Sequence, residues 1–233
     1  MILVIRRRYL LMTLCLILTG LAAIVLLSKR DQISAFTADR VGNVIIIDAG
    51  HGGADGGAVS QNGVIESTLN LEIARKTYAL FCFLGQNAAM TRTGEDGLYE
   101  PDSHTIRQKK VADTRNRVSL VNGYASATLI SIHQNSLPAA PKVHGAQVFY
   151  NSQPHAQELA NVVQAVLNAG VNIGNEKAIS PIPKSVYLMA HVNCDAILVE
   201  CGFLSNTEDT QLLQDMDHQR KLAAAIVCGY LNE

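Results

Sequence analysis

Apolar runs of strand length alternate with longer segments of helical periodicity along most of this chain. The runs read VIIIDA, AAMTR, ATLISIH, GAQVFY and AILVE. Apolar residues at helical spacing predict helices over residues 66–84 and 155–169. Residues 105–122, which Gly123 closes, and residues 217–231 are also expected to be helices. Strands that alternate with helices usually lie parallel and are covered by those helices. The sequence therefore predicts an α/β fold with a mostly parallel sheet flanked by helices.

The beginning of the chain is of a different kind. Three arginines, Arg6 to Arg8, precede Tyr9–Ser28, a stretch with no charged residue. About 20 apolar residues in a helix span a hydrocarbon core of about 30 Å, and a positive cluster stays in the cytoplasm. We therefore expect residues 1–28 to be a transmembrane helix that anchors the chain, with the remainder outside the cytoplasm. A cleaved signal segment, followed by secretion, is the alternative.

Composition restricts the nature of the chain beyond residue 28. Residues 29–42 are mixed and polar and are expected to form a linker, and residues 43–233 a domain with a full core. The net charge is −1 and no basic face is evident, so nucleic acid is not expected as a partner. The five cysteines lack C-x-x-C spacing and predict neither a disulfide framework nor a cysteine zinc site.

Four metal-capable side chains stand where predicted strands end or where the first helix begins. His51 follows the first strand, His133 closes the third, Glu200 closes the last, and Glu66 opens the first helix. Ligands of open α/β sheets bind beyond the carboxyl ends of the strands, so we expect these side chains to converge. Two histidines and one carboxylate are a known set of catalytic zinc ligands that leaves a fourth position for water. These positions together predict a metal site.

Each of these residues also has a structural interpretation. A histidine at a strand end often only packs, and Glu66 could favour the positive end of the helix dipole. A glycine-rich loop after a strand also suggests phosphate binding, but GHGGADGG matches neither G-x-G-x-x-G nor a loop ending in G-K-[ST]. The four positions taken jointly favour the metal.

Three further residues are candidates for supporting roles. Asp48 and Asn135 flank the two histidines and could orient them through hydrogen bonds. Arg117 could contact a substrate, although a charge on the surface of its predicted helix explains it equally well.

Six motifs extend this interpretation: IIIDAGHGGADGGA, GVIESTLNLEIARK, TRNRVSLVN, LISIHQN, GAQVFY and ILVECGFLSNTED. Together they resemble the zinc-dependent N-acetylmuramoyl-L-alanine amidases, over roughly residues 43 to 231. The resemblance implies one zinc ion per chain, bound by His51, Glu66 and His133. It implies a catalytic carboxylate at Glu200, which acts as general base. It also implies that the substrate is peptidoglycan, cleaved at the amide that joins N-acetylmuramic acid to L-alanine.

Two segments, RQKKVADTRNRVSLVN and SVYLMA, most resemble the germination-specific amidases of the spore cortex. They imply a role in cortex maturation, where removal of the stem peptide permits a muramic lactam to form. The alternatives are general cell-wall turnover or cell separation, an exported zinc peptidase acting on stem peptides, and a wall-binding module without metal. No wall-binding repeats follow the domain, so targeting is expected to come from the membrane anchor or from an activating or targeting protein.

Overall fold

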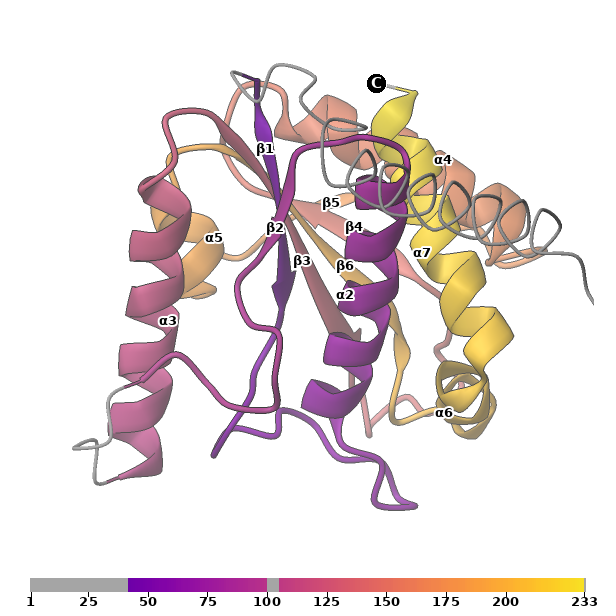
Figure 1. The fold of residues 1–233 in the computed structure, drawn as a ribbon. Coiled ribbons are helices and arrows are strands. Elements are labelled where there is room, and N and C mark those ends of the chain that lie inside the picture. Colours follow the sequence, from indigo (N-terminus) through magenta and orange to yellow (C-terminus); the bar gives the residue numbers. More distant parts are fainter. Residues whose placement is uncertain (1–41, 100–104, 233) are drawn as a thin grey trace, which may run out of the picture. The chain divides into compact units, whose positions relative to one another are not determined.

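A six-stranded sheet runs through residues 42–99 and 105–232, the part of the chain that the computed structural model describes (Figure 1). Its strands lie in the order β2-β1-β3-β6-β4-β5. The strands are β1 Val44–Ala49, β2 Ala88–Met90, β3 Ala127–Asn135, β4 Gln147–Tyr150, β5 Ser180–Pro181 and β6 Asp195–Phe203. The helices are α2 Glu66–Phe83, α3 Ile106–Asn122, α4 Ala156–Gly170, α5 Tyr187–His191, α6 Thr207–Gln214 and α7 Met216–Leu231.

The sheet is mixed rather than wholly parallel. β1 lies parallel to β2 and β3, and β3 lies parallel to β6, but β4 runs antiparallel to β6 and β5 follows β4. A parallel neighbour requires a crossover of about a dozen or more residues, usually a helix. Residues 136–146, all of them described, form no helix between β3 and β4. The chain therefore turns back at the same edge of the sheet, and the predicted parallel arrangement holds for four strands but not for β4 and β5.

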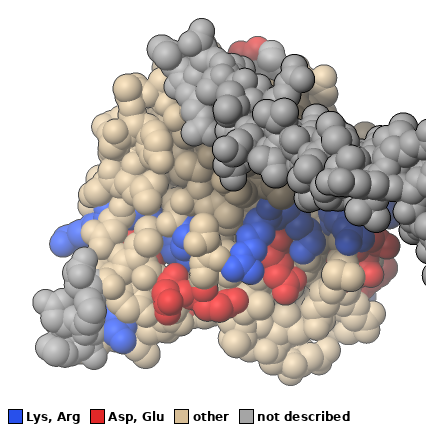
Figure 2. All heavy atoms as spheres, viewed as in Figure 1, with Lys and Arg blue, Asp and Glu red and all other residues tan. Residues whose placement is uncertain are grey.

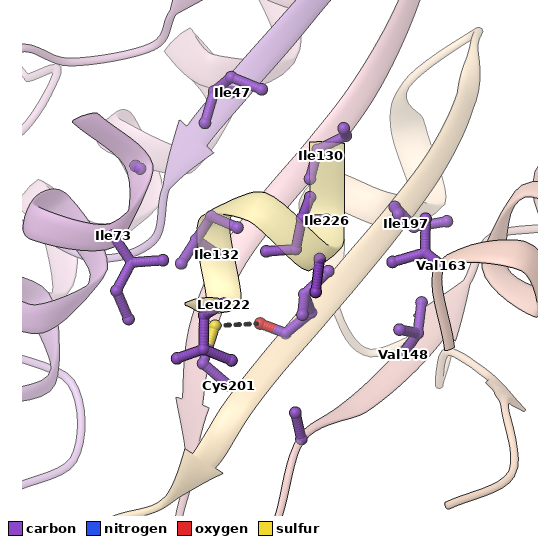
Figure 3. Packing of buried hydrophobic residues seen from close by; sticks show 14 of the residues in the cluster. Ile47, Ile73, Ile130, Ile132, Val148, Val163, Ile197, Cys201, Leu222 and Ile226 are labelled. Atoms are coloured by element: carbon purple, nitrogen blue, oxygen red, sulfur yellow. Dashed lines mark hydrogen bonds between the residues drawn. The ribbon is translucent and has the colours of Figure 1, made fainter. Parts of the chain in front are cut away.

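Helices cover both faces of the sheet, as predicted. α2, α4 and α7 pack on one face, and α3 and α5 on the other (Figure 1). Successive side chains of a strand point to opposite faces, so Ile47 enters the larger core while Ile46 enters the smaller one. Figure 3 shows the larger core, in which Ile73 of α2 and Ile226 of α7 lie among side chains of the central strands. Burial on both faces explains why the strands read as continuous apolar runs.

Local signals set the helix boundaries. The Thr105 hydroxyl accepts a hydrogen bond from the backbone N–H of Gln108 at 3.1 Å, and the Gln108 side chain accepts one from the Thr105 N–H at 2.9 Å. This reciprocal cap satisfies two amides at the start of α3. Asn206 caps α6 by accepting from the N–H of Asp209. The four predicted helices are confirmed with small shifts of their ends, whereas the short α5 and β5 were not predicted.

The predicted transmembrane helix at residues 1–28, and the linker up to residue 41, lie outside the described residues. Among the residues that are described, no helix has the length and apolarity needed to span a membrane.

Candidate metal centre

Three of the predicted side chains meet at the carboxyl edge of the sheet. His51 lies just after β1, His133 lies in the neighbouring β3, and Glu66 is the first residue of α2. One potential ligand atom from each lies within 4.8 Å of the others. Glu66 Oε1 is 3.2 Å from His51 Nε2 and 3.0 Å from His133 Nδ1. The fold thus gathers two imidazoles around one carboxylate that is 3% exposed.

These contacts shift the titration of the groups concerned. Burial disfavours protonation of His51, but hydrogen bonds and charge from Glu66 and Asp55 outweigh it and raise the pKa of His51 to about 9. Burial would raise the pKa of Glu66, but the two histidines hold it well below its usual range. The site therefore keeps a negative charge on Glu66 and favours a cation beside it.

Two buried arginines hold the backbone that carries His51. The φ angle of His51 is 59°, in the left-handed region that residues with a side chain seldom occupy. Arg117 donates from Nη2 to the His51 carbonyl at 2.6 Å and from Nη1 to the Ala49 carbonyl at 2.7 Å. Arg92 donates to the Ala49 carbonyl at 2.8 Å and to the Gly50 carbonyl at 3.1 Å. These hydrogen bonds stabilise the turn in which His51 has this unfavourable backbone conformation.

Arg117 is therefore neither a surface charge nor placed to contact a substrate. It is 3% exposed and lies between the carboxylates of Asp48 and Asp113. Burial would lower the pKa of Arg117, but the two carboxylates raise it. Sequence reasoning missed this because the charges around it in TRNR suggest a solvated helix face.

Asp48 and Asn135 do not make the hydrogen bonds to the candidate histidine ligands that were predicted. Asp48 is buried and accepts hydrogen bonds from Thr91, Ser131 and Arg117, and no bond joins it to either histidine within the described residues. Burial opposes ionisation of Asp48, but Arg117 and the two hydroxyls lower its pKa to about 2. The side chain of Asn135 accepts from the N–H of the next residue, Ser136. Neither residue orients a ring as expected.

The carboxylate that contacts Nδ1 of His51 belongs to Asp55. Its Oδ2 lies 2.9 Å from His51 Nδ1, and its Oδ1 accepts from the N–H of Gly57 at 3.2 Å and from Lys110 Nζ at 3.0 Å. A carboxylate on one ring nitrogen fixes the tautomer and leaves the other nitrogen free to bind metal. Asp55 occurs four residues after His51 in a loop that folds back on itself, which no periodicity reveals.

Glu200 faces the same site from β6. It is paired in register with His133, so both side chains leave the sheet on the same side. Its Oε2 is buried and has no hydrogen-bond partner among the described residues. Burial raises the pKa of Glu200 to about 7 and the charge of Glu66 adds to this, while the two histidines oppose it. A buried carboxylate oxygen without a partner is costly, which indicates that it is kept for a ligand or a reaction.

The residues present fit a zinc ion. Two histidines and one carboxylate form a donor set that zinc accepts. Glycines keep the space around them open, since a Cβ on Gly50 would lie 2.2 Å from Nε2 of His133. A Cβ on Gly57 would lie 2.4 Å from Oε2 of Glu66. The unpartnered Oε2 of Glu200 supplies a fourth polar group at the same edge.

Comparison with known proteins accounts for this arrangement. Residues 45–232 match the Amidase_3 family, described as N-acetylmuramoyl-L-alanine amidase. The chain is 32% identical over 205 residues to the germination-specific N-acetylmuramoyl-L-alanine amidase of Bacillus subtilis, covering 88% of this chain and 85% of that protein. It is 25% identical over 217 residues to the amidase AmiA of Escherichia coli, covering 81% and 75%.

Solved structures agree with the sequence matches. The CwlD amidase from Clostridioides difficile, solved in complex with the GerS lipoprotein, superposes with a TM-score of 0.78 at 34% identity, over 82% of this chain and 99% of that one. An N-acetylmuramoyl-L-alanine amidase from Clostridium difficile 630 gives a TM-score of 0.70 at 28% identity, over 82% and 96%. The chain therefore belongs to the N-acetylmuramoyl-L-alanine amidase family.

Proposed function

We propose that residues 43–233 form the catalytic domain of a zinc-dependent N-acetylmuramoyl-L-alanine amidase that acts on peptidoglycan. The observation that carries the zinc assignment is the convergence of His51, Glu66 and His133 beside the unpartnered carboxylate of Glu200. His51, Glu66 and His133 would hold one zinc ion per chain. When bound, zinc supplies a Lewis acid that polarises the substrate carbonyl and acidifies water.

The chain's own residues carry the proton transfers. Glu200 accepts a proton from the attacking water as its oxygen bonds to the lactyl carbonyl carbon. The same carboxylic acid then delivers that proton to the amide nitrogen as the carbon–nitrogen bond breaks and L-alanine leaves. Asp55 orients His51, and Arg117 and Arg92 hold the backbone of the turn.

Metal analysis of variants tests the ligand assignment. His51→Ala and His133→Ala should each lose zinc and activity together, since each removes one of three ligands. His155→Ala is the control, because its exposed ring lies outside the site. Full zinc content in both ligand variants, measured by elemental analysis, would remove these histidines from the metal site.

Product analysis separates the amidase from the alternatives. Mass spectrometry of digested peptidoglycan should show intact stem peptides and muramic acid free of peptide. A zinc peptidase would instead release shortened stem peptides, and a wall-binding module would release nothing.

We also propose that the enzyme acts on spore cortex. This rests on the similarity to the germination-specific amidase of Bacillus subtilis. A deletion strain should form spores that lack muramic lactam and fail to complete germination, while vegetative cells divide normally. Chained cells, or spores with normal lactam content by muropeptide chromatography, would favour wall turnover or cell separation instead.

Localisation is inferred from the N-terminal sequence, and a partner from a similar solved structure. We propose that residues 1–28 anchor the enzyme in the membrane and that the catalytic domain lies outside the cytoplasm. The similar CwlD amidase forms a complex with a lipoprotein, which supports a partner that targets or activates this chain. Protease treatment of intact protoplasts should degrade residues 43–233, and a mature N-terminus near residue 35 would show a cleaved signal.

A further inference from the structure

A groove lies between α3 and α5 on the side of the sheet where Arg117 is buried. It has a volume of about 320 Å³ and is lined by Lys110, Val111, Thr114, Arg115 and Tyr187. Val111 is 44% exposed and Tyr187 is 41% exposed, so an apolar surface remains open to solvent. The Tyr187 ring stacks on His191 with a centroid distance of 3.9 Å, which holds the ring in place.

The groove is connected to the metal centre through one carboxylate. Lys110 Nζ lies 3.0 Å from Asp55 Oδ1, and the other oxygen of Asp55 lies 2.9 Å from His51 Nδ1. Lys110 therefore stands at the end of the groove nearest to the candidate zinc ligands.

The two charged side chains that line the groove, Lys110 and Arg115, are both cationic. Arg107, Lys110 and Arg115 are exposed on α3, and the one acidic residue of that helix, Asp113, is buried against Arg117. Figure 2 shows Lys and Arg side chains on the part of this face that α3 forms. Arg115 has no hydrogen-bond or ion-pair partner within residues 42–99 and 105–232. No described residue therefore competes with an anion for its guanidinium.

A stem peptide of peptidoglycan has the matching chemistry. It is a short chain of small residues that carries free carboxylates and the methyl groups of alanine. Arginine binds carboxylates through paired hydrogen bonds, and a tyrosine ring offers an apolar surface to methyl groups. The glycan strand carries mostly neutral hydroxyl groups, so it matches the two cationic side chains of the groove less well than the peptide does.

We propose that the groove between α3 and α5 binds the stem peptide of the substrate, with Arg115 pairing with one of its carboxylates. This rests on the proposed function, because the stem peptide is one of the two products only if the enzyme hydrolyses the amide that joins it to muramic acid. Lys110 serves two partners in this arrangement, Asp55 and the incoming peptide.

The test compares two substrates on the full chain loaded with zinc. One is a soluble muramyl tetrapeptide with free carboxylates, and the other is the same molecule with those carboxylates converted to carboxamides. Arg115→Ala should raise KM for the first substrate about tenfold with little change in kcat, as expected for one charge-assisted hydrogen bond. The carboxamide should be bound equally by the variant and the natural chain. Arg220→Ala on α7 removes the same charge outside the groove and should leave both values unchanged.

Each outcome supports or overturns the assignment. Unchanged KM in Arg115→Ala, or an equal rise for both substrates, would overturn the groove assignment while leaving the amidase intact. Arg115→Glu should raise KM for the acidic substrate further than Arg115→Ala, and equal effects would count against a charge contact. Shortened stem peptides among the products, in place of an intact released peptide, would overturn the proposed function itself.

Discussion

Asp55 contacts Nδ1 of His51 and leaves Nε2 turned toward Glu66, where we propose that zinc binds. Asp55→Asn keeps the size of the side chain but removes the charge that holds Nδ1. Loss of such a carboxylate–histidine contact typically lowers metal affinity by roughly 10- to 100-fold. Titration against a chromophoric zinc chelator should show this loss, and exposed Asp217→Asn should show none. Equal affinities of the two variants would assign the orientation of His51 to its backbone alone.

A substitution at Glu200 should separate zinc binding from catalysis. Glu200→Gln cannot accept a proton but keeps the shape of the side chain. It should retain zinc while kcat falls by at least about 100-fold, the usual scale for loss of a general base. Near-normal turnover in this variant would mean that another group takes the proton.

Whether the role of each of these residues can be predicted from the sequence depends on the structural element that positions it. The convergence of His51, His133 and Glu200 could be predicted because each lies close to the carboxyl end of its strand. β1, β3 and β6 are parallel, so these ends share one edge of the sheet. Asp55 could not, because its position depends on a loop that folds back at an irregular turn. Arg117 was misjudged because its pair with Asp113, four residues earlier, also fits an exposed helix face, while the carboxylate that completes its buried environment, Asp48, is distant in sequence.

At the level of elements, the contact between α4 and α7 depends on the absence of a side chain. A Cβ on Gly229 would lie 2.6 Å from the backbone of Val163. Gly229→Ala should therefore destabilise the protein by about 1–3 kcal/mol, although alanine favours helix by up to about 1 kcal/mol. Gly170→Ala at the end of α4, where nothing lies within 4 Å, isolates the propensity effect. Denaturant unfolding should show opposite signs for the two variants.

The helices and strands also show which structural features could not be predicted from the sequence. Periodicity located α2 and α4 because each buries an apolar face against the sheet. It could not reveal that β4 runs antiparallel, since orientation depends on the connection from β3 and not on the strand itself. β5 and α5 are too short to produce a periodic pattern.

For the whole molecule, we expect the protein to remain folded when the metal is removed. The two cores are built from side chains other than the candidate ligands. Removing zinc with a chelator should abolish activity and lower Tm, because a bound ligand stabilises the folded state. Far-UV circular dichroism should remain that of a folded protein, and added zinc should restore activity. A chelated chain that unfolds at room temperature would show that the metal is part of the fold.

The described sheet ends at each side on its shortest strands. β2 has 3 residues and β5 has 2, the second of which is Pro181. An unpaired strand edge is a template on which another chain can add a strand, and native proteins blunt such edges to avoid aggregation. Proline has no N–H to offer to a further strand. Each edge of the described sheet thus offers only two or three residues of strand to an incoming chain, which limits pairing of two molecules edge to edge.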